Sequence, residues 1–185
     1  VKAEGVGAIE ALRDIAPDAF IVADLKTMDT GQVEVDMAFN ETADGVVCAG
    51  QAPLEVIEKF IYEARRVGIL SFLDLIGVED PIKLLKKLKD LPDVVELHRA
   101  IDEEDVKKPK WELIPKIRAT FPKKKFLVAV AGGIEPDTTA YALKQGADII
   151  IVGRYITQSK DIERSTRNFI NLLQGDIDLK RIHTE

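Results

Sequence analysis

The segment Ile21 to Asp29, IVADLKTMD, has an aspartate, a lysine and a second aspartate at the spacing D-x-K-x-x-D. Side chains two residues apart in a strand point to the same face, so Asp24 and Lys26 are expected to lie together, with Asp29 within reach on the following loop. Burying such charges is costly unless they are paired or bind a ligand. Two interpretations follow: a structural salt bridge with Asp29 as a helix cap, or a catalytic site at the end of a strand.

Two further polar residues end apolar runs. Asp74 follows Phe72-Leu73 and would serve either as a turn or capping residue or as a contact for a substrate hydroxyl. His98 ends the run VVELH on the same face as Glu96, which is a candidate to orient it. A lone histidine is more often structural than catalytic. Imidazole can transfer a proton near neutral pH, however, and the position at a strand end favours catalysis.

Glycines at the ends of the last two apolar runs indicate an anion site. One run ends in Gly132-Gly133 and the next in Gly153-Arg154. Glycines let backbone N–H groups approach an anion closely, and a guanidinium adds charge-assisted hydrogen bonds. Each pair alone is ordinary turn chemistry, but together, on consecutive strand–helix units, they predict one phosphate site.

Short apolar runs rich in Val and Ile alternate with longer amphipathic runs along the chain. The runs of strand length are 19–25, 45–49, 69–75, 94–98, 126–130 and 149–152. The helix-like stretches are 8–15, 33–39, 53–67, 81–88, 111–120, 138–145 and 162–173. Nearly continuous hydrophobicity is typical of parallel strands covered on both faces, so the sequence predicts a parallel α/β sheet.

The polar residues described above follow several different strands, and the C-terminal ends of the strands are where a (β/α)-barrel has its active site. An open dinucleotide-binding sheet would have a glycine-rich turn after its first strand, and none is present. Six strands are too few for an eight-stranded barrel, and the first element is the helix 8–15. We therefore expect an α/β fold, a (β/α)8 TIM barrel whose first strand–helix–strand is missing, as one domain over 1–185 with a C-terminal tail over 174–185.

Composition narrows the possible partners and the setting. A formal net charge of −6 argues against nucleic acid and against an anionic membrane surface, and no apolar stretch is long enough to span a bilayer. Cys48 is the only cysteine, so no internal disulfide is possible and a reducing, cytoplasmic setting is expected. One thiol and two histidines cannot complete a four-ligand structural zinc site. The charged run 102–110 is expected to be a solvated loop that could close over a substrate.

These residues resemble the orotidine-5′-phosphate decarboxylase suprafamily, whose barrels share a D-x-K-x-x-D motif and a paired phosphate site. Within it, ADLKTMD followed by Gly31 is similar to the signature of the 3-hexulose-6-phosphate synthase family. The similarity continues through Asp74, His98, AGGI at 131–134 and VGR at 152–154. The last part, from YITQS at 155–159 to DIDL at 176–179, looks like the synthase half of archaeal fusions with formaldehyde-activating enzyme.

The resemblance implies a reversible aldol reaction that joins formaldehyde to D-ribulose 5-phosphate through a 1,2-enediolate, in a homodimer with shared active sites. It implies that Asp24 is a ligand of Mg²⁺ or Mn²⁺, that Lys26 hydrogen-bonds the enediolate, and that His98 transfers the proton. The remaining implied roles are a reach into the partner's site for Asp29, substrate hydroxyl contacts for Asp74, and phosphate binding for Gly132, Gly133, Gly153 and Arg154. The family's first-strand Asp and second-strand Glu are not located in this sequence, which leaves the metal site incomplete.

Two alternatives stay open. The 3-keto-L-gulonate-6-phosphate decarboxylase family forms a similar enediolate by losing CO₂, but it tends to have Glu at the position of Asp74 and Arg where Ile101 stands. Orotidine decarboxylase itself is less similar, since it needs a nucleobase pocket and no metal. The other alternative is a catalytically silent phosphosugar-binding fragment. Missing strands favour this interpretation, whereas the presence of every later polar position disfavours it.

Overall fold

The computed structural model describes residues 3–101 and 109–174, which form one six-stranded parallel sheet in the order β1-β2-β3-β4-β5-β6. The strands are β1 Val22–Thr27, β2 Gly45–Ala49, β3 Leu70–Asp74, β4 Val94–His98, β5 Leu127–Ala131 and β6 Ile149–Ile151. The helices are α1 Ala8–Ile15, α2 Gly31–Asn40, α3 Leu54–Val67, α4 Pro81–Lys87, the 3-10 helix η2 Trp111–Leu113, α5 Ile114–Thr120, α6 Pro136–Lys144, α7 Arg154–Thr157 and α8 Ile162–Gln174. The predicted tail beyond residue 174 and most of the predicted loop 102–110 lie outside the described residues.

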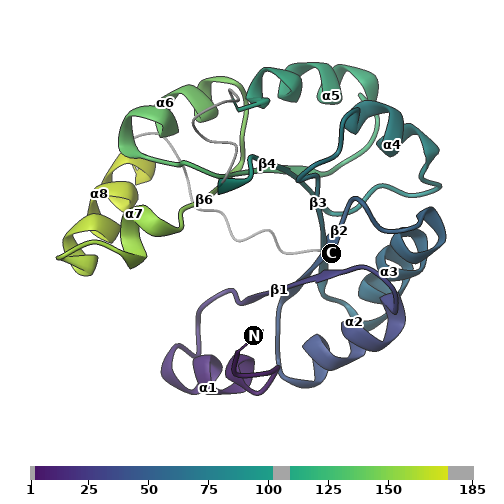
Figure 1. Ribbon diagram of the computed structural model, residues 1–185, viewed down its shortest axis with the longest axis horizontal. Helices are drawn as coiled ribbons and strands as arrows, with labels where there is room; N and C mark the ends of the chain where they lie inside the picture. The colour runs from purple at the N-terminus through teal and green to yellow at the C-terminus, as the bar shows by residue number, and fades with distance from the viewer. Residues whose placement is uncertain (1–2, 102–108, 175–185) are drawn as a thin grey trace.

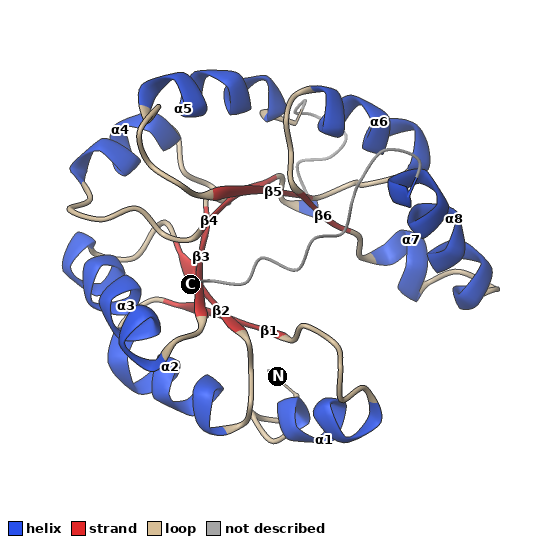
Figure 2. Ribbon diagram, turned by 180° about the vertical axis from the view of Figure 1, so that it is seen from behind, coloured by secondary structure: helices blue, strands red, loops and turns tan. Residues whose placement is uncertain are grey.

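The sheet is strongly curled, with the helices arranged around its outer face (Figure 1). Seen from behind, the ring is open between β1 and α1 on one side and β6, α7 and α8 on the other (Figure 2). All neighbouring strands are parallel. The predicted α/β architecture is therefore confirmed as a six-stranded, open part of a (β/α)-barrel. Closure by two further strands stays a prediction.

Apolar side chains cover both faces of the central strands. The outer face contributes to the large core under the helices, which includes Val46, Leu73 and Val95. The inner face has its own smaller cluster, formed by Val47, Phe72, Val94 and Ala129. Burial on both faces explains why the strands read as continuous apolar runs rather than as alternating ones.

Most predicted element boundaries agree with the structure to within one or two residues. Asp80 caps α4 as expected, because its Oδ1 accepts a hydrogen bond from the Lys83 N–H at 2.9 Å. Gly146 has φ +96° just past α6, the left-handed conformation predicted there. No helix in residues 3–101 and 109–174 has the length and apolar character to cross a membrane.

One predicted strand was misplaced, and one short helix was missed. The first strand covers Val22–Thr27 rather than 19–25, so Asp24 and Lys26 both lie inside it, Lys26 in its C-terminal part. Hydrophobicity alone located this strand too early, because a strand that lines a polar site continues through charged positions. The short helix α7 directly after Gly153 was not predicted.

An aspartate immediately before each even-numbered strand fastens that strand to its neighbour at the end of the sheet opposite the polar residues. Each carboxylate accepts a hydrogen bond from a backbone N–H of the preceding odd-numbered strand, or of the residue just before that strand begins. The bonds are Ile21 N to Asp44 at 2.7 Å, Ser71 N to Asp93 at 2.9 Å and Val128 N to Asp148 at 2.7 Å. Since each bond joins two strands that are distant in sequence, the three aspartates help to fix the register of the sheet.

We expect Asp148→Ala to lower the free energy of unfolding by about 1–3 kcal/mol, because the buried Val128 N–H loses its acceptor and Arg118 loses an ion pair of 2.6 Å. Urea unfolding followed by the fluorescence of Trp111, the only tryptophan in the sequence, measures the change. The control is Asp14→Ala on the exposed side of α1, for which we expect a change within about 0.5 kcal/mol. Equal effects of the two variants would contradict the proposed role of Asp148.

Candidate active site

Lys26 occupies an unusual backbone conformation near the end of β1. Its φ of +49° lies in the left-handed region that non-glycine residues rarely adopt, and the pairing of β1 with β2 shifts register between Ala23 and Thr27. Strain of this kind costs on the order of 1–3 kcal/mol and is concentrated at functional sites. Lys26 Nζ lies 3.1 and 2.9 Å from the two carboxylate oxygens of Asp24, so the two charges that were expected to meet do so.

Asp74, at the end of β3, connects three strands of the sheet. Its Oδ2 accepts from Lys26 Nζ at 2.5 Å and lies 2.9 Å from His98 Nδ1, while its Oδ1 accepts from the Ile76 N–H at 2.8 Å. The Asp74 side chain is 0 % exposed. Both oxygens of this carboxylate are therefore engaged with protein groups and covered by them.

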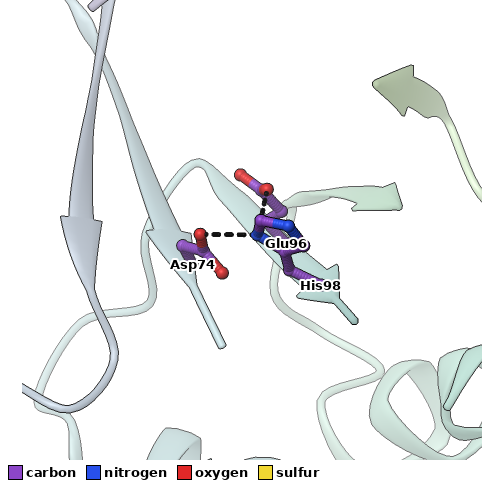
Figure 3. Close-up of side chains that lie close together, drawn as sticks. All are labelled: Asp74, Glu96 and His98. Carbon is purple, nitrogen blue, oxygen red and sulfur yellow. Dashed lines mark hydrogen bonds and ion pairs between the residues drawn. The ribbon is translucent and has the colours of Figure 1, made fainter. Parts of the chain in front are cut away.

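His98, the last residue of β4, lies between two carboxylates (Figure 3). Its Nδ1 is 2.9 Å from Asp74 Oδ2 and 3.5 Å from Glu96 Oε1. Asp74, and not Glu96 as the sequence indicated, is thus the nearer partner of the imidazole. The opposite edge of the ring carries Nε2, and the residue contributes to the wall of the cavity described below.

The charges of this cluster shift one another's protonation. Burial lowers the pKa of Lys26, but hydrogen bonds to Asp74 and Asp24 outweigh burial, so the pKa lies above its ordinary value. Burial likewise lowers the pKa of His98, but the hydrogen bond to Asp74 outweighs burial, so this pKa also lies above its ordinary value. The pKa of Asp74 is lowered because its bonds to His98 and Lys26 outweigh burial. The cluster therefore favours an ionised carboxylate beside an ammonium and a readily protonated imidazole.

Glu96 is the exception among these charges. Burial and the neighbouring charge of Asp74 raise its pKa from 4.5 to about 7. Its side chain is only 5 % exposed, and the inner apolar cluster with Phe72 and Val94 lies one layer below it. Glu96 is therefore a carboxyl group that can be protonated near neutral pH beside His98.

The glycine pairs and Arg154 line the same cavity as Asp24, Glu96 and His98. The cavity has a volume of about 1760 Å³, and its walls include Asp24, His98, Gly133, Gly153 and Arg154. This volume exceeds the roughly 300–1,000 Å³ typical of ligand pockets because the cavity continues into the open interior of the sheet. The predicted anion-binding loops and the predicted proton-transfer residue thus share one space.

Gly132 is required by the close approach of two strand ends. Its φ is +88°, and a Cβ at this position would lie 2.0 Å from the carbonyl oxygen of Arg99. Any side chain here would push apart the ends of β4 and β5, which carry His98 and the glycine loop. Gly132 therefore has a structural function in addition to its predicted place in the anion site.

The remaining residues of the motif lie outside the cavity. Asp29 is exposed on the turn between β1 and α2, and no hydrogen bond or ion pair of its side chain occurs among the described residues. Gly31 begins α2, where a Cβ would lie 2.9 Å from the backbone of Val56 and Phe60 in α3. The glycine of the motif is thus explained by helix packing, and the predicted role of Asp29 stays a prediction.

The oxygen donors of the site fit a divalent cation. Ligand atoms of Asp74, Glu96 and His98 lie within 4.8 Å of one another, but the ammonium of Lys26 would compete with a cation for Asp74 and also for Asp24. Asp24 is more open, with 55 % of its side chain exposed at the cavity wall. Mg²⁺ often uses only one or two carboxylates together with water and substrate oxygens, so Asp24 is the better candidate ligand.

A curled parallel sheet with charged residues at the carboxyl ends of β1, β3 and β4 and glycine-rich turns after β5 and β6 defines a (β/α)-barrel enzyme fold with its candidate site at the usual face. Residues 1–169 match the sequence profile of the orotidine 5′-phosphate decarboxylase / HUMPS family, and the chain belongs to this family.

The chain is 51% identical over 187 residues to the bifunctional enzyme Fae/Hps of Methanocella arvoryzae and 47% identical to that of Archaeoglobus fulgidus. Both alignments cover 100% of the chain but only 47% and 46% of the relatives, so the chain spans about half the length of the curated relatives it matches. The solved structure of 3-hexulose-6-phosphate synthase from Salmonella typhimurium is 31% identical, with a TM-score of 0.83 over 92% of this chain and 81% of that one. The solved structure of KGPDC, a 3-keto-L-gulonate-6-phosphate decarboxylase, from Streptococcus mutans is 20% identical and shares the fold. Its TM-score is 0.77 over 92% of this chain and 80% of that one.

The raised pKa of Glu96 generates a prediction about stability. The unfolded chain loses the Glu96 proton near pH 4.5 and the folded chain near pH 7, so the folded state loses stability as pH rises through this window. Glu96→Gln should therefore gain stability over the wild type on going from pH 5 to pH 8, by on the order of 2 kcal/mol. Urea unfolding in metal-free buffer at both pH values measures the gain. The exposed Glu10→Gln on α1 is the control, and a gain that does not change with pH would contradict burial of an ionisable Glu96.

Proposed function

We propose that this chain forms a 3-hexulose-6-phosphate synthase domain, an aldehyde-lyase that joins formaldehyde to D-ribulose 5-phosphate to give D-arabino-hex-3-ulose 6-phosphate, and that the reaction is reversible. The observation that carries this proposal is the contact of one buried carboxylate, Asp74, with both the ammonium of Lys26 and the imidazole of His98. The similarity to the bifunctional Fae/Hps enzymes and to the solved synthase supports the same reaction for this chain.

The first step in this proposal is removal of a proton from C1 of ribulose 5-phosphate, next to the C2 carbonyl. His98 accepts this proton through Nε2, since its Nδ1 faces Asp74. Negative charge then develops on the C2 oxygen and on C1, while the C1 hydroxyl keeps its proton. The ammonium of Lys26, with its pKa above the ordinary value, stays protonated and stabilises that charge as an enediolate.

The second step forms the new bond. C1 of the enediolate attacks the carbon of formaldehyde, the π electrons of the formaldehyde carbonyl move to its oxygen, and that oxygen takes a proton. His98 in its protonated form is placed to return the proton that it removed, so the cycle leaves the enzyme unchanged. The reverse reaction cleaves the same carbon–carbon bond and uses the same residues.

A divalent cation, Mg²⁺ or Mn²⁺ with Asp24 as its protein ligand, would supply a Lewis acid for the substrate oxygens. The phosphate would be bound by backbone N–H groups of Gly132, Gly133 and Gly153 and by the guanidinium of Arg154. The cavity walls that include Gly133, Gly153 and Arg154 also include His98, which supports one site for both ends of the substrate.

We further propose a cytoplasmic homodimer in which Asp29 contributes to the partner's site. The exposure of Asp29 on the β1–α2 turn, away from the cavity of its own chain, supports this assignment. The whole chain 1–185 is proposed to act as one domain.

The decarboxylase alternative has weaker support, since the decarboxylase structure above shares only the fold and Ile101 occupies the cavity wall where that family tends to have Arg.

The proposed function is tested by the consumption of ribulose 5-phosphate in the presence of formaldehyde. With the full protein and Mg²⁺ we expect hexulose 6-phosphate to form, and we expect EDTA to abolish its formation. Asp24→Asn should reduce the rate at least about 100-fold, because a neutral amide is a poor ligand for a hard cation. Asp14→Asn, an exposed change on α1 away from the cavity walls, is the matched control. Turnover that is unaffected by EDTA would contradict the metal assignment, and absence of turnover would contradict the synthase assignment.

The phosphate site generates a separate prediction. Arg154→Gln should raise the KM for ribulose 5-phosphate roughly 10–100-fold, because a charge-assisted hydrogen bond to an anion contributes about 1.5–3 kcal/mol. Arg164→Gln, on α8 and away from the large cavity, should leave the KM unchanged. Steady-state kinetics with a varied ribulose 5-phosphate concentration compare the two. Equal KM values for Arg154→Gln and the wild type would rule out this guanidinium as a phosphate ligand.

A further inference from the structure

Asp74 is enclosed by the protein although the substrate space lies beside it. Its side chain is 0 % exposed, and it is absent from the walls of the cavity, which include its neighbours Glu96 and His98. Its Oδ1 accepts from the backbone N–H of Ile76, so the carboxylate is fixed in orientation by the chain that immediately follows it. A substrate hydroxyl would have to displace one of these protein partners to reach Asp74.

The other oxygen of Asp74 contacts the two groups that the proposed reaction needs most. Oδ2 lies 2.5 Å from Lys26 Nζ and 2.9 Å from His98 Nδ1. An ionised carboxylate can only accept hydrogen bonds, so His98 Nδ1 must carry a hydrogen to bond with it. In the neutral ring the free electron pair is then on Nε2, the nitrogen that a base uses to take a proton.

We propose that Asp74 is a positioning residue that fixes the Nδ1–H tautomer of His98 and the location of the Lys26 ammonium, and that it does not bind the substrate itself. The kinetic consequences of this proposal rest on the proposed function. The predicted tautomer of His98 is a property of the protein alone. It differs from the substrate hydroxyl contact that family resemblance implies for this position, because it assigns both oxygens of the carboxylate to protein groups.

Glu96 does not replace Asp74 in this role. Its Oε1 is 3.5 Å from His98 Nδ1, beyond a good hydrogen bond, whereas Asp74 Oδ2 is at 2.9 Å. The charged groups that act on His98 are Asp74 from β3, Glu96 from β4 and Lys26 from β1. Of these, Asp74 alone has an oxygen within hydrogen-bond distance of the imidazole among the described residues.

The direct test is the tautomer of His98, measured by ¹⁵N–¹H correlation spectra of the full protein labelled with ¹⁵N-histidine. The resonances of His98 are identified by their loss in His98→Asn. At a pH where the ring is neutral, we expect the proton on Nδ1, the opposite of the tautomer that free histidine prefers. A proton on Nε2 in the wild type would overturn the proposal, and this measurement needs neither substrate nor a variant of Asp74.

The kinetic test separates positioning from substrate binding. Asp74→Asn should lower kcat by roughly 10²–10⁴-fold, the usual contribution of an oriented acid–base group, while the KM for ribulose 5-phosphate changes by less than about threefold. The acidic limb of the pH–rate profile should move to lower pH, because loss of this carboxylate lowers the pKa of His98. A raised KM with unchanged kcat would show that Asp74 is a substrate ligand and would overturn the proposal.

Asp93→Asn is the matched control, since it changes the carboxylate that bonds Ser71 at the opposite end of the same two strands. It should lower stability while leaving the tautomer of His98 and the pH profile unchanged. A shift of the pH profile in Asp93→Asn equal to that in Asp74→Asn would show a general structural effect and overturn the proposal. A wild-type protein with the Nδ1–H tautomer but no synthase activity would support the positioning role and contradict the proposed function.

Discussion

The buried carboxylate of Asp74 is the interaction on which the arrangement of the candidate site depends. It is covered completely, and a buried charge is tolerated only when it is paired and hydrogen-bonded. Here the pairing groups are the ammonium of Lys26 and the imidazole of His98, and the backbone of Ile76 supplies a further bond. The requirement to satisfy one carboxylate therefore brings a cation and a base together at the mouth of the barrel.

The sheet makes this convergence possible. Lys26, Asp74 and His98 come from β1, β3 and β4, and the parallel order of the strands brings their carboxyl ends to the same edge. The opposite edge is fixed by the aspartates that precede β2, β4 and β6. Stability and chemistry are thus separated along the strands, with register set at one end and polar function at the other.

The interior of the curled sheet gives the site its electrostatic character. Apolar residues such as Phe72 and Val94 form the layer below Glu96, so this carboxyl group has little solvation and its pKa rises to about 7. Asp74, the cross-strand register partner of Glu96, has cationic partners and its pKa falls. Two carboxyl groups on adjacent strands therefore differ in protonation near neutral pH because their immediate partners differ.

The sequence by itself determined the alternation of strands and helices, the parallel α/β class and the residue types of the site, because hydrophobic periodicity and motif spacing are local properties. It also predicted the contact between Asp24 and Lys26, which are two residues apart. It could not show that Asp74 lies between Lys26 and His98, which are 48 and 24 positions away, nor that Glu96 is the more distant partner of the imidazole. Those contacts depend on strand register, on the curl of the sheet and on the irregular backbone at Lys26, all of which arise from packing between segments far apart in the chain. Only the tertiary structure decided them.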